Sequence, residues 1–133
     1  MGKTSNTKRL CEGDRCFIEF SYCFPELPDG AAGVRMEKTL VMLKDAALSR
    51  AEAALPALAA RYAESTDPHK AMRHRPLELS LDFFAEEKKH CYHISLRLSL
   101  CRCGRTLAQR KEAARFDKQS GRLLFRRKRN SDL

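Results

Sequence analysis

The sequence predicts an α+β fold, in which one long helix, kinked at a proline, packs on an antiparallel β-sheet of about four to five strands. Apolar residues recur at steps of three and four between about residues 32 and 64, which is typical of one face of an α-helix. Apolar and polar residues alternate before and after this segment, which indicates strands with one buried face. At 133 residues, 43% hydrophobic and 32% charged, the chain has the size and composition of one globular domain.

Three regions are expected along the chain: a flexible leader over residues 1–14, a single α+β domain over 15–125, and a basic, disordered tail over 126–133. The leader has no hydrophobic periodicity. The first predicted strand follows it, with alternate residues on one face: Cys16, Ile18, Phe20, Tyr22 and Phe24. Pro25, Pro28 and Gly30 then end this strand with residues typical of turns.

The long helix is expected from about Ala32 to Glu64. Its apolar stripe consists of Met36, Leu40, Leu43, Ala47, Ala51, Leu55, Leu58 and Tyr62. Pro56 lies inside this segment, where it removes a backbone donor and crowds the carbonyl of Glu52. We therefore expect a kink or a break at that position.

The second half of the chain returns to alternation. Residues 77–82 and 92–100 flank a charged turn and predict a β-hairpin. Residues 107–116 are ambiguous, because local propensity favours a helix whereas topology favours a third strand. A turn follows, in which the Asp117 carboxylate caps backbone amides and Gly121 supplies a positive φ. The buried sheet face is expected to comprise Ile18, Phe20, Leu77, Leu79, Leu81, Ile94, Leu96 and Leu98.

Two short motifs and their order resemble a known family. Residues 24–27 form an aromatic-Pro-x-Leu turn, and a strand-rich half closes on residues 116–124, Phe-Asp…Gly-Arg-Leu-Leu. Across residues 16–125 the chain resembles a bacterial domain of poorly defined function. That domain forms the extracytoplasmic part of a lysozyme-responsive anti-sigma factor and accompanies some peptidoglycan deacetylases.

The resemblance implies a helix-over-sheet binding domain without catalytic residues, and it supports a strand over residues 107–116. The chain departs from the family in two ways. It shows no membrane anchor or signal, and residues 102–105, Arg-Cys-Gly-Arg, stand where the family often has Gly-Gly-Ala-His. Cell-envelope function and lysozyme binding are therefore not carried over to this chain.

The cysteines and histidines do not form a recognisable site. Cys101 and Cys103 are separated by one residue, not the two to four of a zinc knuckle. Cys91 and His93 share strand parity with them, but up to ten residues separate these side chains along the chain. All six cysteines are expected to be reduced thiols, and no metal or cofactor is expected. The acidic pair Glu86 and Glu87, beside two lysines, indicates a surface charge cluster rather than a catalytic dyad.

Positive charge is concentrated at the C-terminal end. The chain carries a net charge of +9, and residues 104–133 hold ten Lys and Arg against three acids, which is +7. Such a patch either binds anions or serves as a solubilising face. The candidate phosphate contacts are Arg122, Arg126, Arg127, Lys128 and Arg129. With Phe125 as the one aromatic among them, we expect weak, non-sequence-specific binding.

The sequence thus predicts a non-enzymatic binding module with a protein or other macromolecular partner of undetermined identity. A cytoplasmic location is expected, because no secretory signal or spanning segment is visible. The resemblance implies a bacterial source. The alternative is a nucleic-acid-associated protein that uses its C-terminal arginines. A thiol- or metal-dependent enzyme is a third hypothesis, and it requires two or more of Cys91, His93, Cys101 and Cys103 to converge.

Overall fold

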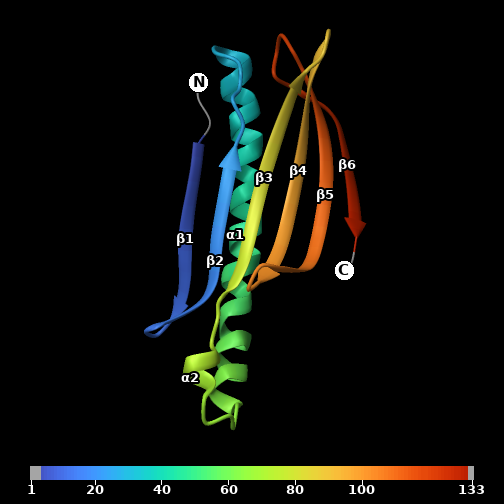
Figure 1. The fold of residues 1–133 in the computed structure, drawn as a ribbon. Coiled ribbons are helices and arrows are strands. Elements are labelled where there is room, and N and C mark those ends of the chain that lie inside the picture. The colour runs from blue at the N-terminus through green and yellow to red at the C-terminus, as the bar shows by residue number, and fades with distance from the viewer. Residues whose placement is uncertain (1–3, 132–133) are drawn as a thin grey trace.

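A six-stranded mixed sheet carries one long helix on one of its faces (Figure 1). The computed structural model describes residues 4–131, with side chains described for residues 5–126. The elements in chain order are β1 (Thr4–Glu12), β2 (Arg15–Phe24), α1 (Ala31–Glu64), α2 (Lys70–Arg73), β3 (Leu77–Glu87), β4 (Cys91–Arg102), β5 (Arg105–Asp117) and β6 (Leu123–Ser131). Strand order in the sheet follows the chain, from β1 at one edge to β6 at the other.

The sheet differs from the predicted antiparallel sheet of four to five strands. It has six strands, and β2 pairs with β3 in parallel whereas the other neighbours are antiparallel. The length of α1 explains the parallel pair. Its 34 residues span about 51 Å, whereas the 10 residues of β2 span about 33 Å. The helix therefore returns the chain to the end of the sheet where β2 began, and β3 runs in the same direction as β2.

The regions predicted as a flexible leader and a disordered tail each contain a strand in their described part, and residues 1–3 and 132–133 lie outside the described residues. Residues 4–12 form β1, which pairs with β2, and residues 123–131 form β6, which pairs with β5. Strand β1 is mostly polar, and β6 has a short apolar run over residues 123–125 before a polar remainder, so apolar and polar residues do not alternate along either segment. Their backbone hydrogen bonds are supplied by neighbouring strands, and their charged side chains are typical of the edges of a sheet.

The core lies between α1 and the sheet. The predicted helix stripe is confirmed, since Met36, Leu40, Ala47, Ala51 and Leu55 are buried and Leu43, Leu58 and Tyr62 pack against them. The predicted sheet face is confirmed in the same way. Its buried members are Ile18, Phe20, Leu81, Ile94 and Leu96, whereas Leu77, Leu79 and Leu98 are partly buried against the core.

The helix is not broken at Pro56, because α1 runs from Ala31 to Glu64 without interruption. Leu55 and Leu58 hold the helix against the core on either side of the proline. This packing outweighs the loss of one backbone hydrogen bond.

Residues 107–116 lie within the strand β5, which resolves the ambiguity of the sequence in favour of topology. Strand β5 pairs with β4 on one side and with β6 on the other. Its residues Ala114 and Phe116 are buried on the face of the sheet that packs against α1. Two ladders of backbone hydrogen bonds and this burial override a local preference for helix.

Candidate functional site

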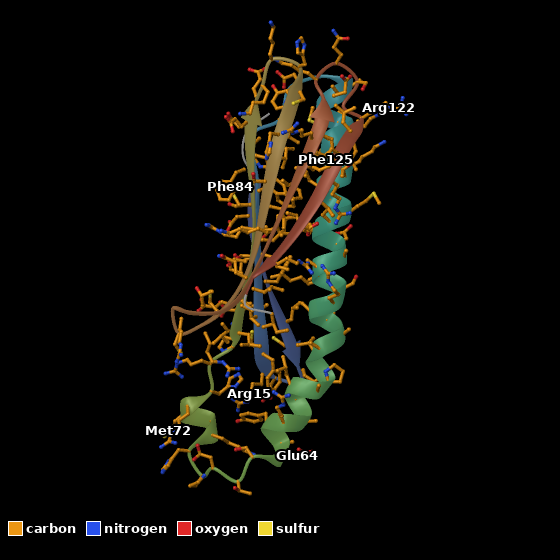
Figure 2. All side chains as sticks on the ribbon, turned by 90° about the vertical axis from the view of Figure 1, so that its right-hand side faces the viewer. Arg15, Glu64, Met72, Phe84, Arg122 and Phe125 are labelled. Atoms are coloured by element: carbon orange, nitrogen blue, oxygen red, sulfur yellow. The ribbon has the colours of Figure 1, made fainter. Side chains whose placement is uncertain are left out.

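One face of the sheet carries no helix and is called here the open face. Side chains on it alternate with the buried ones along each strand. None of its members in β2–β5 is buried: Glu19, Ser21 and Cys23 from β2, Glu78, Ser80, Asp82 and Phe84 from β3, His93, Ser95, Arg97 and Ser99 from β4, and Gln109, Lys111, Ala113 and Arg115 from β5. Figure 2 shows Phe84 on the side of the sheet opposite α1.

Charge on the open face is divided between its two halves. The acids Glu19, Glu78 and Asp82 lie on β2 and β3, whereas the cations Arg97, Lys111 and Arg115 lie on β4 and β5. Arg97 lies 3.7 Å from the Asp82 carboxylate, where the two halves meet. Among the described residues, Lys111 and Arg115 have no carboxylate within ion-pairing distance. The basic half therefore presents cations that remain available to a ligand.

A hollow of about 350 Å³ lies in the basic half, beside Phe84. Phe84 is 52% exposed, and the Arg97 guanidinium lies 5.4 Å from the centre of its ring. Ser95, Lys111 and Ala113 also line the hollow. Because alanine leaves space where longer side chains would stand, the hollow can accept a flat group on Phe84 with negative charge beside it.

Of the five basic residues predicted as phosphate contacts, Arg122 and Arg126 have described side chains, and the two lie in different surroundings. Arg122 lies in the turn before β6 and is exposed. Arg126 lies on the helix side, where it donates two hydrogen bonds to Glu112, at 2.8 and 3.2 Å.

The remaining three predicted contacts, Arg127, Lys128 and Arg129, lie in β6, and their side chains are outside the described residues. Their register is described: Arg127 pairs with Ala113 and Arg129 with Lys111, which are open-face positions, whereas Lys128 pairs with Glu112 on the helix side. Phe125 pairs with Arg115 on the open face and is 52% exposed. The open face thus has a second exposed aromatic residue next to a cation.

Sequence reasoning missed Phe84, Arg97, Lys111 and Arg115 as members of a candidate site. One signal was present for Phe84. It follows Phe83 directly, and adjacent residues in a strand face opposite sides, so only one of the two can be in the core. Phe83 is 4% exposed and Phe84 is 52% exposed. The cations gave no such signal, because alternating charged residues are typical of any solvated strand face.

The cysteines and histidines are not brought together. Cys91 and Cys101 lie at opposite ends of β4, about 33 Å apart at 3.3 Å per residue. Over residues 4–131, no group of three or more His, Cys, Asp or Glu is placed to hold a metal ion. All six cysteines are unpaired.

His74 has a structural position in the segment before β3. Its Nε2 lies 2.6 Å from the carbonyl oxygen of Cys16, so this nitrogen donates the proton. Its ring packs edge-on against Phe17 and Tyr62. These contacts hold the segment before β3 against the start of β2 and the end of α1.

Glu86 and Glu87 form the surface charge cluster expected from the sequence. Hydrogen bonding from Lys88 lowers the pKa of Glu86, and hydrogen bonding from Lys118 and Tyr92 lowers the pKa of Glu87. A general acid needs a carboxyl pKa raised by burial, so the direction of both shifts is opposite to that requirement.

Comparisons with known proteins add no family assignment: no family model, no curated protein and no solved structure matches the chain. Within the described part of the chain, no helix is both long enough and apolar enough to cross a membrane.

Proposed function

We propose that this chain is a non-enzymatic binding module that holds a macromolecular partner on the open face of its sheet. One observation carries the proposal. A helix-free face presents exposed Phe84 beside Arg97 and a hollow of about 350 Å³. Aromatic residues and arginine are enriched in protein–protein interfaces.

The division of charge on the open face favours a protein as the partner. A surface with acids on β2 and β3 and cations on β4 and β5 is complementary to a partner surface of the opposite arrangement. A uniform polyanion would be repelled by the acidic half. The resemblance to the extracytoplasmic bacterial domain, the bacterial source, the cytoplasmic location and the lack of enzymatic activity stay predictions.

This proposal is tested by capture from native lysate after nuclease treatment, with two charge-reversal variants. Lys111→Glu changes the open face, whereas Lys38→Glu makes the same charge change at an exposed position on α1. We expect the wild type and Lys38→Glu to retain the same protein and Lys111→Glu to lose most of it. Equal capture by both variants would show that the open face is not the binding surface.

Nucleic acid is a second candidate, favoured by the basic half of the open face alone. Arg97, Lys111 and Arg115 are spread over β4 and β5, with Phe84 and Phe125 exposed on the strands to either side. Single-stranded nucleic acid binds to such surfaces through stacking on aromatic rings and neutralisation of phosphates.

Salt dependence distinguishes the two candidates. With three phosphate contacts, affinity for a labelled single-stranded oligonucleotide should fall about 20-fold between 50 and 200 mM salt. Phe84→Ala should remove about 1–3 kcal/mol of stacking energy, measured by fluorescence anisotropy at 50 mM salt. Binding that is unchanged by both Phe84→Ala and Lys111→Glu would exclude this surface as a nucleic-acid interface.

A further inference from the structure

The helix side of the sheet contains a second hollow, which lies on the opposite side from the open face. It occupies about 270 Å³ between α1 and strands β3–β6 and is called here the helix-side groove. Its walls include Ala46 and Ala47 from α1 and Leu96 and Leu98 from the sheet. Met42, at the rim, is 70% exposed. The helix therefore leaves part of the apolar face of the sheet uncovered.

Three arginines and one carboxylate line this groove. Glu112, which is 9% exposed, accepts hydrogen bonds from Arg126 and lies 3.8 Å from the Nε of Arg110. Arg50 projects from α1 and, among the described residues, has no carboxylate within ion-pairing distance. With three cations and one anion the groove has a net charge of +2, so it favours an anionic ligand.

One donor in the groove is buried and unsatisfied. The Nε of Arg110 has no hydrogen-bond partner among the described residues, because 3.8 Å to Glu112 is too long for a hydrogen bond. Buried donors in folded proteins are nearly always paired, and an exception points to an acceptor absent from the protein itself. The Arg110 guanidinium, which lines the groove, therefore has hydrogen-bonding capacity that the described residues leave unused.

The apolar surface continues beyond the arginines. An adjoining hollow of about 220 Å³ shares Arg50, Leu98 and Arg110 with the helix-side groove and is otherwise lined by Leu79, Leu100 and Ala108 among others. A ligand whose acidic group is bound by the arginines can therefore extend an apolar body in this direction. A volume of 270 Å³ equals that of about nine waters at 30 Å³ each, so the ligand is small.

We infer that the helix-side groove binds a small amphipathic anion, an aliphatic carboxylate of about eight carbons being its simplest form. The carboxylate receives hydrogen bonds from Arg50 and Arg110, and the alkyl chain covers Leu96 and Leu98. Glu112 accepts hydrogen bonds from Arg126 and lies 3.8 Å from Arg110, so Arg50 is the groove cation that the described residues leave without an ion pair. This inference concerns a different surface from the open face and does not depend on the function proposed for it.

The test is titration of the full chain with sodium octanoate by calorimetry, beside octanol and octylamine as matched probes. Octanoate should bind saturably and at least about tenfold more tightly than octanol, since hydrogen bonds to charged groups distinguish the two. Octylamine should bind more weakly than octanol, because its charge is repelled by the net charge of the groove.

Two pairs of variants locate the site. Ala46→Glu places a negative charge at the groove, whereas Ala53→Glu makes the same change at an exposed position of α1 that does not line it. Arg50→Gln removes a cation of the groove, whereas Arg97→Gln removes one from the open face. We expect Ala46→Glu and Arg50→Gln to weaken octanoate binding at least about tenfold and each control to change it less than about twofold.

All four substituted residues are solvent-exposed, and thermal melts verify that the variants fold. Octanol binding as tightly as octanoate would overturn the inference, because the arginines would then have no role. The inference would also be overturned if octanoate did not bind at millimolar concentration. The same holds if each variant and its control lost octanoate affinity equally.

Discussion

Asp117 and Gly121 form the turn that joins β5 to β6. The Asp117 carboxylate accepts hydrogen bonds from the amide and the hydroxyl of Ser120, at 2.8 and 2.7 Å, and Gly121 has a φ of 73°. The turn chemistry predicted from the sequence is thereby confirmed. The structure adds that Gly121 lies directly against the Ala32 carbonyl at the start of α1. This turn thus packs on the helix, and its residues affect more than the local chain direction.

Gly121→Ala should lower the free energy of unfolding by at least about 2 kcal/mol, because two costs add. The residue would take a left-handed backbone conformation with a side chain, and the new Cβ would overlap backbone atoms of Ala32. Gly104→Ala is the matched control, since its φ is 78° but no atom lies within 4 Å of the new Cβ. Denaturant unfolding should show a clearly smaller loss for Gly104→Ala, and equal losses would mean that the contact with α1 is unimportant.

Stability should depend on the ionisation of Asp117. Hydrogen bonds from Ser120 lower the pKa of Asp117 below its ordinary value of 3.8. A carboxyl whose pKa is lower in the folded state stabilises the fold above its unfolded pKa, and this contribution disappears as the pH falls through the lowered value. The difference in melting temperature between wild type and Asp117→Asn should therefore be constant above about pH 5 and shrink at lower pH.

Ser120→Ala provides an independent measurement of the same effect. Without the hydroxyl donor, the pKa of Asp117 should rise toward 3.8, as followed by carboxyl NMR chemical shifts. An Asp117 that titrates at the same pH in both proteins would show that the Ser120 hydroxyl does not cause the shift.

Strand β4 shows how a single element supports both faces of the sheet. Leu96 is 6% exposed and belongs to the core under α1, whereas its neighbours Ser95 and Arg97 lie on the open face. Two strands pair with β4 along its length, so its position is tightly constrained. The backbone under the open face is therefore the same hydrogen-bonded backbone that carries the core residues.

Leu96→Ala should destabilise the fold by about 2–5 kcal/mol, the range for removing a buried leucine side chain. Ser95→Ala, one residue away and not buried, should change the free energy of unfolding by less than about 0.5 kcal/mol. Both are measured by urea denaturation. A near-neutral Leu96→Ala would contradict the assignment of this strand face to the core.

At the scale of the whole molecule, the two edge strands of the sheet are β1 and β6, and both contain several charged residues. Strands β1 and β6 lie at opposite edges in Figure 1, and each has one neighbour. Residues 126–131 pair with residues 109–114 in β5, so the C-terminal basic segment is part of the sheet. Deleting the C-terminal basic segment would remove part of an edge strand as well as the positive charges. Its role in binding is therefore better tested by substitution than by deletion.

Deletion of residues 126–133 should lower the melting temperature by several degrees, since it removes the strand pairing and the Arg126 partner of Glu112. A second variant replaces Arg127, Lys128 and Arg129 with glutamine. It keeps the backbone of β6 and removes three charges, so its melting temperature should lie within a few degrees of that of the wild type. Circular dichroism melts compare the two. Equal melting of the truncated chain and wild type would show that β6 contributes little to the fold.

Local patterns predicted most of the fold but little of the candidate site. The stripe from Met36 to Tyr62 and the alternation around Leu79 and Ile94 indicated a helix and strands correctly, because burial selects apolar residues at the period of each element. Strand β1, in which Leu10 is the one buried side chain over residues 5–12, had no such pattern. The groups around Phe84 and Glu112 were not predicted, because each gathers residues from separate strands.

The sequence by itself thus determined the long helix and the strands around residues 16–24, 77–82 and 92–100, together with the residues of these elements that face the core. It also determined the chemistry of the turn at Asp117 and Gly121. These properties depend on interactions within a few residues along the chain. The tertiary structure alone decided the parallel pairing of β2 with β3, the edge strands β1 and β6, and the side of the sheet left open. Those properties depend on hydrogen bonds and contacts between residues distant in sequence, and they bring Phe84 beside Arg97 and Arg126 beside Glu112.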